Sequence, residues 1–130
     1  MQQTADSAAL VRVYVVEDSL PIRERLDAMI IAAGAAVAGH ASTVAAAIAS
    51  ILVERPELVI LDMQLADGTG FDVLRAIRQQ APDIDVYFLS NFAAYPYRDL
   101  AERLGAKGFF DKSREFDLMR EVVAQRAAGH

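Results

Sequence analysis

Short runs of consecutive apolar residues alternate along the chain with longer segments in which apolar residues recur at helical spacing. The runs cover residues 11–16, 36–41, 58–61, 86–89 and 109–110. Runs rich in β-branched or aromatic residues, without polar alternation, are typical of strands buried on both faces, as in a parallel sheet. The run at 36–41 is weaker, because Val37 is its only β-branched residue, and we assign it as a strand from its length and neighbours.

Each run is followed by a segment whose apolar residues fall on one face of a helix. The five sets are Ile22, Leu26, Met29 and Ile30; Val44, Ala47, Ile48 and Ile51; Phe71, Leu74 and Ile77; Tyr97, Leu100, Ala101 and Leu104; and Phe116, Met119, Val122 and Val123. Helix start signals agree with them, since Ser19 precedes Pro21 and Ser42 precedes Val44. Gly105 stands where a helix would end.

Five consecutive strand–helix units predict an α/β fold with parallel strand pairing and right-handed crossovers. We expect a single-domain, doubly wound five-stranded parallel sheet of the flavodoxin-like (βα)5 type, with strand order 2-1-3-4-5 and helices on both faces. The predicted domain covers residues 10–126, between a flexible tail at 1–9 and a flexible end at 127–130. No linker or low-complexity tract interrupts it, so we expect no second domain.

Composition narrows the class of function. The chain has 130 residues and a formal net charge of −5, whereas a nucleic-acid partner would require a basic face. It has no Cys, which excludes disulfides, thiolate metal sites and Cys nucleophiles and fits a cytoplasmic protein. Its longest apolar stretch, residues 28–39, is shorter than the ~18 residues of a membrane span.

Polar residues stand at the carboxyl ends of the predicted strands, where open α/β sheets bind their ligands. Glu17 and Asp18 end the first strand, Asp62 ends the third, Ser90 ends the fourth, and Lys112 follows the fifth. Three carboxylates at close range need a shared proton or a bound cation, and an all-oxygen cluster suits Mg²⁺ or Mn²⁺. With a hydroxyl and a lysine added, such a cluster is typical of phosphoryl transfer, in which a carboxylate can act as the nucleophile.

Five motifs carry a resemblance to a known family. In chain order they are VVEDS (15–19), VILDM (59–63), DGTGFDVL (67–74), FLSN (88–91) and GAKGFFDKS (105–113). The chain resembles a receiver domain of the two-component response regulators, of the stand-alone, CheY-like type, over residues 10–126. The resemblance implies a domain that accepts a phosphoryl group from the phosphohistidine of a sensor histidine kinase or a histidine phosphotransfer protein.

The resemblance also implies a role for each residue of the site. Asp62 would be the phospho-acceptor, and Glu17 and Asp18 would form the acidic pair of the metal site. The backbone carbonyl of Gln64 would complete the protein's ligands to the metal, and Lys112 would pair with the phosphoryl group.

Ser90 and Phe109 are implied to form the switch that moves on phosphorylation, with the Ser90 hydroxyl bound to the phosphoryl oxygens. The change would be read by an unknown downstream protein on the surface of the fourth helix, fifth strand and fifth helix. The chain would catalyse only its own phosphorylation and dephosphorylation, in the cytoplasm, as a monomer or a phosphorylation-dependent dimer. Neither nucleic acid nor membrane is an expected partner.

Three positions depart from the family pattern. Ala66 replaces the usual Pro four residues after the acceptor, and Ser113 replaces the Pro that usually follows the lysine, often in a cis peptide. A cis bond without Pro costs ~3 kcal/mol, so either the loop bears that cost or the peptide is trans. Asn91 and then Phe92 stand where a small residue is usual, and larger side chains there would screen the phosphoryl group from water.

Other interpretations of the same residues are open. Glu17 and Asp18 could end a strand and cap the next helix, Ser90 could be a loop hydroxyl, and Phe109 could fill the core. The alternative functions are a receiver fold that signals without phosphorylation, and a phosphoryl shuttle or sink. An Asp-nucleophile phosphatase would need a D-x-D motif after the first strand, and a flavodoxin a phosphate-binding Ser/Thr/Gly loop there; the sequence has neither.

Overall fold

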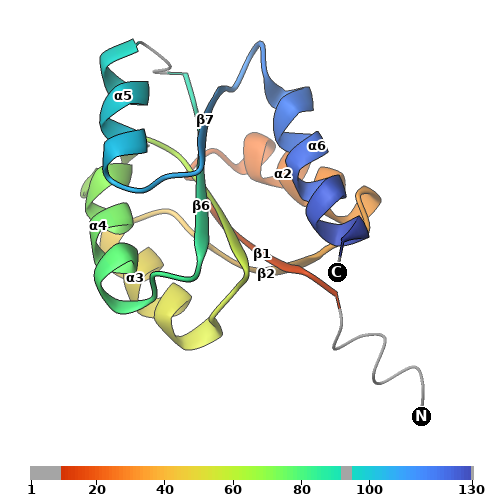
Figure 1. Cartoon of the computed structure of the whole chain (residues 1–130), viewed down its shortest axis with the longest axis horizontal. Coiled ribbons are helices and arrows are strands. Elements are labelled where there is room, and N and C mark those ends of the chain that lie inside the picture. The colour runs from red at the N-terminus through yellow and green to blue at the C-terminus, as the bar shows by residue number, and fades with distance from the viewer. Residues whose placement is uncertain (1–9, 92–94, 130) are drawn as a thin grey trace.

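The computed structural model describes residues 10–91 and 95–129, and in these residues five parallel strands form the main sheet (Figure 1). The strands are β1 (Arg12–Val16), β2 (Ala36–Ala41), β3 (Leu58–Leu61), β6 (Asp85–Ser90) and β7 (Gly108–Asp111). Their order in the sheet is β2-β1-β3-β6-β7, which is the predicted order 2-1-3-4-5 for the five strands along the chain. The weak apolar run at 36–41 is therefore a strand, and it lies at one edge of the sheet.

Helices cover both faces of this sheet (Figure 1). In the described residues they are α2 (Leu20–Ala32), α3 (Val44–Glu54), α4 (Gly70–Gln80), α5 (Tyr95–Arg103) and α6 (Phe116–Ala128). α2 and α6 pack on one face and α3, α4 and α5 on the other, each group over its own apolar cluster, which confirms the doubly wound architecture. α6 runs past residue 126, the end that we expected for the domain. None of the described helices is both long and apolar enough to cross a lipid bilayer.

The central strands are buried as their composition predicts. All four side chains of β3 are buried, because helices cover the sheet above and below this strand. β1 and β3 pair in register from Val13–Leu58 to Val16–Leu61. The two strands therefore end at the same level, which places the residues that follow them next to each other.

The N-terminus of α3 differs from the expectation. Its N-cap is Thr43 and not Ser42, because the Thr43 hydroxyl accepts a hydrogen bond from the N–H of Ala46 at 3.1 Å. α2 begins after Ser19 as expected, with the Ser19 hydroxyl 3.5 Å from the N–H of Ile22.

The buried face of α5 includes fewer residues than the helical spacing of its apolar residues predicted. Tyr97 is 40% exposed, although its position in the series placed it on the buried stripe. The buried contact of this helix is made by Ala101, with Leu100 and Leu104 half-buried at its margin. Gly105 follows with a φ of +103°, a left-handed conformation that favours glycine.

A small antiparallel hairpin that we did not predict follows β3. β4 (Gln64–Leu65) pairs with β5 (Gly68–Thr69), and α4 begins directly after the hairpin. Strands of two residues show no hydrophobic period, so the sequence pattern could not indicate them.

Gly70, the first residue of α4, lies against the carboxyl end of β3. A Cβ atom at this position would be 2.4 Å from the carbonyl oxygen of Asp62 and 2.5 Å from Cε1 of Phe88. The absence of a side chain therefore lets α4 start directly beside the strand end that carries Asp62.

Gly70→Ala is expected to lower the free energy of unfolding by about 1–3 kcal/mol, because the added methyl group overpacks the core. Gly129→Ala is the matched control, since its Cβ would be 3.4 Å from the carbonyl oxygen of Gln125, an ordinary contact distance. Urea unfolding followed by circular dichroism measures both variants. A Gly70→Ala variant as stable as the wild type would contradict this account of the close approach.

Candidate functional site

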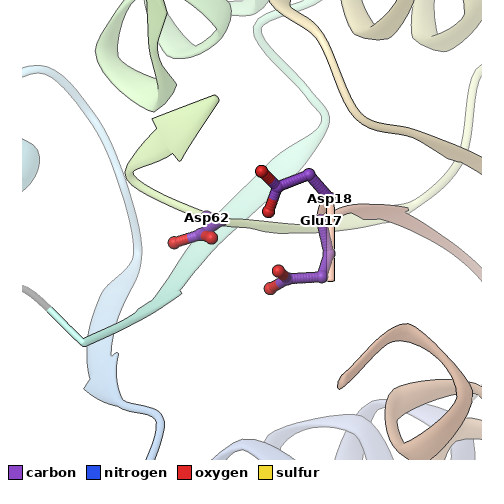
Figure 2. A group of neighbouring side chains, drawn as sticks. All are labelled: Glu17, Asp18 and Asp62. Atoms are coloured by element: carbon purple, nitrogen blue, oxygen red, sulfur yellow. The ribbon is translucent and has the colours of Figure 1, made fainter. Parts of the chain in front are cut away.

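The ends of β1 and β3 bring acidic side chains to one edge of the sheet. Val16 pairs with Leu61 at the end of the β1–β3 ladder, so Glu17 and Asp62 follow side by side. The N–H of Asp62 donates to the carbonyl of Val16 at 3.0 Å, which extends this ladder by one hydrogen bond. Asp18 comes next, and one oxygen from each of the three carboxylates lies within 4.8 Å of the other two. Figure 2 shows the three side chains reaching to the same side of the strand ends.

Lys112 supplies the positive charge of this cluster. Its Nζ lies 2.8 Å from Oε1 of Glu17 and 3.0 Å from Oδ2 of Asp62, and all three side chains are at most 10% exposed. The second oxygen of each carboxylate accepts a backbone hydrogen bond. The N–H of Ser19 donates to Oε2 of Glu17 at 3.0 Å, and the N–H of Met63 donates to Oδ1 of Asp62 at 2.7 Å. Every carboxylate oxygen of the two buried acids therefore has a donor.

Burial and pairing act in opposite directions on these charges. Burial raises the pKa of Glu17 above its ordinary value, and the hydrogen bond from Lys112 offsets part of that rise. Burial alone would lower the pKa of Lys112, but the hydrogen bonds and negative charges of Glu17 and Asp62 outweigh burial, and the pKa is raised. The lysine is therefore protonated at neutral pH.

A cleft of about 240 Å³ opens beside these groups. Its lining residues are Glu17, Asp18, Ser19, Asp62, Gln64, Asn91 and Lys112. Since one water molecule takes up ~30 Å³ of liquid, the cleft has room for a hydrated ion beside a phosphoryl group. Asn91 is exposed on the cleft wall, and Phe92 lies outside the described residues.

The donor atoms of the cleft fit a hard divalent cation. Glu17, Asp18 and Asp62 offer carboxylate oxygens, and Gln64 lines the same cleft. Mg²⁺ takes oxygen ligands and commonly keeps several waters, with one or two carboxylates from the protein. Because the chain has no Cys, soft thiolate ligands are absent from its sequence.

Ser90 and Phe109 are buried and do not line the cleft. Ser90 ends β6 and is fully buried, and its carbonyl accepts the N–H of Lys112 at 3.1 Å. The ring of Phe109 stacks on that of Phe88, with the ring centroids 5.1 Å apart. The structure thus brings the predicted acids, Gln64 and Lys112 to one cleft, and it places the two predicted switch residues on the paired strands β6 and β7, outside the cleft lining.

The loop after Lys112 is held by the carboxylate of Asp111. Its Oδ1 accepts hydrogen bonds from the N–H and the hydroxyl of Ser113, at 2.8 and 2.7 Å, and from the N–H of Arg114 at 3.2 Å. The bonds from Ser113 are the main reason that the pKa of Asp111 is lowered. No cis peptide occurs in the described residues, so the Lys112–Ser113 bond is trans.

Arg98 on α5 also supports this loop, and the sequence analysis did not identify it. It donates to the carbonyl of Phe109 and lies 2.7 Å from Oε1 of Glu115. The same oxygen of Glu115 accepts the N–H of Asp111 at 2.8 Å. The pair joins residues 17 positions apart, for which no local pattern gives a signal.

Comparisons with known proteins are consistent with this site. The family model described as "Response regulator receiver domain" matches residues 13–124. The chain is 38% identical over 77 residues to the regulatory protein LuxO of Vibrio cholerae, a match covering 59% of this chain and 17% of that protein. It is 30% identical over 115 residues to the DNA-binding transcriptional activator DevR/DosR of Mycobacterium tuberculosis, covering 87% of this chain and 53% of that one. The chain thus spans about half or less of these two relatives.

A solved structure extends the likeness to the fold. The non-phosphorylated HemR receiver domain of Leptospira biflexa superposes on this chain with a TM-score of 0.77 at 30% sequence identity. The match covers 88% of this chain and 94% of the HemR chain. The similarity therefore spans nearly all of that receiver domain.

Lys112→Met is expected to lower the free energy of unfolding at pH 7 by about 3–5 kcal/mol, because it leaves two buried carboxylates without their cation. The pKa of Glu17 is already raised by burial, so its ionised form opposes folding. The deficit is therefore absent below the ordinary Glu pKa and grows as the pH rises through the raised one. Urea unfolding at pH 7 and at acid pH measures this trend.

Lys107→Met is the matched control for that experiment. Lys107 is an exposed lysine whose Nζ lies 3.6 Å from Oδ1 of Asp85, so its removal should change stability by less than about 1 kcal/mol. Equal losses in the two variants, or a Lys112→Met deficit that does not shrink in acid, would show that the buried pairing is unimportant.

Proposed function

Because the chain belongs to the response regulator receiver domain family, we propose that it is a phosphoryl acceptor in a two-component system or phosphorelay. The acceptor is the carboxylate of Asp62, and the donor is a phosphohistidine on a sensor histidine kinase or a histidine phosphotransfer protein. One observation carries this proposal: Asp62 is nearly buried at a strand end, 3.0 Å from Lys112 and beside two more carboxylates in one cleft. An acid that only capped a helix would need neither a buried lysine nor acidic neighbours.

The proposed transfer exchanges one bond to phosphorus for another. A carboxylate oxygen of Asp62 forms an O–P bond while the N–P bond of the donor breaks, and the leaving histidine nitrogen takes up a proton. Lys112 is protonated and already touches the acceptor, so it can shift its ammonium group to neutralise charge on the phosphoryl oxygens. The N–H of Met63 holds the carboxylate in a fixed orientation during the attack.

Mg²⁺ or Mn²⁺, when bound, would neutralise negative charge on the phosphoryl oxygens and on the acidic cluster. Asp18, Asp62 and the backbone carbonyl of Gln64 would hold the ion, with Glu17 beside it. Asp18 is exposed and already lines the cleft. The carboxylate of Glu17 is held by Lys112 and the N–H of Ser19, so it contributes mainly through its charge.

Phosphorylation of Asp62 would add a charged group next to the buried layer that contains Ser90 and Phe109. The Ser90 hydroxyl would bond a phosphoryl oxygen, and the ring of Phe109 would shift with it. The surface of α5, β7 and α6 includes the strand that carries Phe109, and on its α5–β7 part a hollow of about 330 Å³ is lined by Arg98 and Phe109, among other residues. We place the contact with a downstream effector protein on this surface.

The wider setting follows from the same proposal. Residues 10–126 would act as the receiver, in the cytoplasm, as a monomer or a phosphorylation-dependent dimer. The chain would catalyse only its own phosphorylation and dephosphorylation and would signal through protein contact. Its net charge of −5 does not favour a nucleic-acid partner.

Incubation of the protein with Mg²⁺ and acetyl phosphate is expected to add one phosphoryl group, measured as a gain in intact mass. Asp62→Ala should abolish the gain because it removes the nucleophile, and EDTA should reduce it to background. Asp117→Asn, which alters an exposed acid of α6, is the control and should label like the wild type.

Equal labelling of Asp62→Ala and the wild type would refute Asp62 as the acceptor. An unlabelled wild type would favour the phosphorylation-independent interaction module instead.

Asn91→Ala is expected to shorten the half-life of the phosphoryl group several-fold. Asn91 lines the cleft, where its side chain would screen the acyl phosphate from attacking water. Mass spectrometry after removal of the donor measures the decay. Gln79→Ala, which removes an exposed amide from α4, serves as the control, and equal half-lives for Asn91→Ala and the wild type would contradict the screening role.

A further inference from the structure

We propose that Asp67 is a positioning residue of the phosphoryl-acceptor site, which fastens the β4–β5 hairpin to α3 and so holds the Gln64 carbonyl in place for the metal ion. The inference rests on the proposed function, because it concerns the same cleft. Asp67 is exposed and is not among the residues that line the cleft. Its carboxylate instead contacts a helix that begins 23 residues earlier in the chain.

The carboxylate of Asp67 binds the first two amides of α3. Oδ1 accepts the N–H of Val44 at 2.6 Å, and Oδ2 accepts the N–H of Ala45 at 3.2 Å. A helix leaves these N–H groups without partners of its own, and Thr43 satisfies a further one, that of Ala46. α3 has no acidic residue in its first turn, so the negative charge that its positive end favours comes from the hairpin.

The hairpin is packed between two helix N-termini. A Cβ atom on Gly68 would lie 3.0 Å from Cγ2 of Val44 and 2.8 Å from Oδ2 of Asp72, so β5 passes closely between α3 and α4. On the α4 side, the N–H of Thr69 donates to Oδ2 of Asp72 at 3.1 Å. Asp67 makes the corresponding contact on the α3 side, so both flanks of the hairpin are fastened.

The length of the hairpin explains why it needs this support. Even longer isolated hairpins are only marginally stable in water, and these strands have two residues each. Gln64 pairs with Thr69 and lines the cleft, two residues after Asp62. Without the contact from Asp67, the hairpin would lose its bonds to α3 and Gln64 would occupy a wider range of positions. A metal site binds more weakly when a ligand is poorly held.

The charge state of Asp67 suits this role. The hydrogen bond from the N–H of Val44 is the main cause of a lowered pKa for Asp67, so the carboxylate is ionised at neutral pH. A residue that only capped α3 would affect stability alone. Thr43 caps the same end of the same helix without belonging to the hairpin, and it therefore separates the two roles.

The test titrates Mg²⁺ into the full chain by isothermal calorimetry and compares Asp67→Ala with Thr43→Ala. Both variants remove hydrogen bonds to α3 amides, so both should unfold at lower urea concentration than the wild type. We expect Asp67→Ala to raise the Mg²⁺ dissociation constant about tenfold, the scale for loss of a residue that supports a metal ligand. Thr43→Ala should leave this constant unchanged. In acetyl phosphate labelling, Asp67→Ala should need more Mg²⁺ for half-maximal rate and reach the wild-type rate at saturation.

Asp67→Asn keeps one acceptor oxygen and should give an intermediate dissociation constant, which also provides the comparison if Asp67→Ala does not fold by circular dichroism. A wild-type dissociation constant in the Asp67 variants, or an equal rise in Thr43→Ala, would overturn the positioning role and leave the proposed function intact. Failure of the wild type to bind Mg²⁺ would overturn both.

Discussion

The ammonium group of Lys112, shared between Glu17 and Asp62, is the interaction on which the rest of the site depends. Two nearly buried carboxylates at adjacent strand ends would repel each other, and a cation within hydrogen-bond distance of both reverses that repulsion. The lysine comes from the loop after β7, the edge strand, and must reach past the end of β6 to arrive there. The backbone N–H of Lys112 donates to the carbonyl of Ser90 at the end of β6, and this hydrogen bond holds the lysine backbone beside that strand.

The sequence predicted those parts of the fold that depend on residue type and period. Strands buried on both faces and helices with one apolar stripe leave patterns several residues long, and the five strands followed from these patterns. The strand order was taken from the flavodoxin-like fold type that the strand–helix alternation indicates. Even the strand at 36–41, with only Val37 β-branched, was found by its place in the alternation. The β4–β5 hairpin was missed because its two-residue strands carry no pattern. The cap at Thr43 in place of Ser42 depends on backbone angles that the neighbouring residues do not determine.

The site was predictable where it depends on strand ends. Parallel strands end at one edge of the sheet, and the structure gathers Glu17, Asp18, Asp62 and Lys112 around one cleft there. Gln64, which only the family resemblance indicated, lines the same cleft, whereas Ser90 at the end of β6 is buried and does not line it. Contacts between loops and helices were not predictable, because each depends on the completed fold. Asp67 bonds Val44 across 23 positions of sequence, and Arg98 bonds Glu115 across 17. Neither pair has a spacing that a helix or a strand would make regular.

The two loops that flank the cleft lack the prolines that the family resemblance led us to expect, and each is held by a nearby carboxylate instead. Asp67 follows Ala66 and binds two amides of α3, and Asp111 binds the amides that follow Lys112, including that of Ser113. The hydrogen bond from the N–H of Val44 is the main cause of the lowered pKa of Asp67, and the hydrogen bonds from Ser113 are the main cause of the lowered pKa of Asp111. The support is therefore complete above their ordinary pKa and is lost as the pH falls through the lowered values, whereas a proline ring would be indifferent to pH.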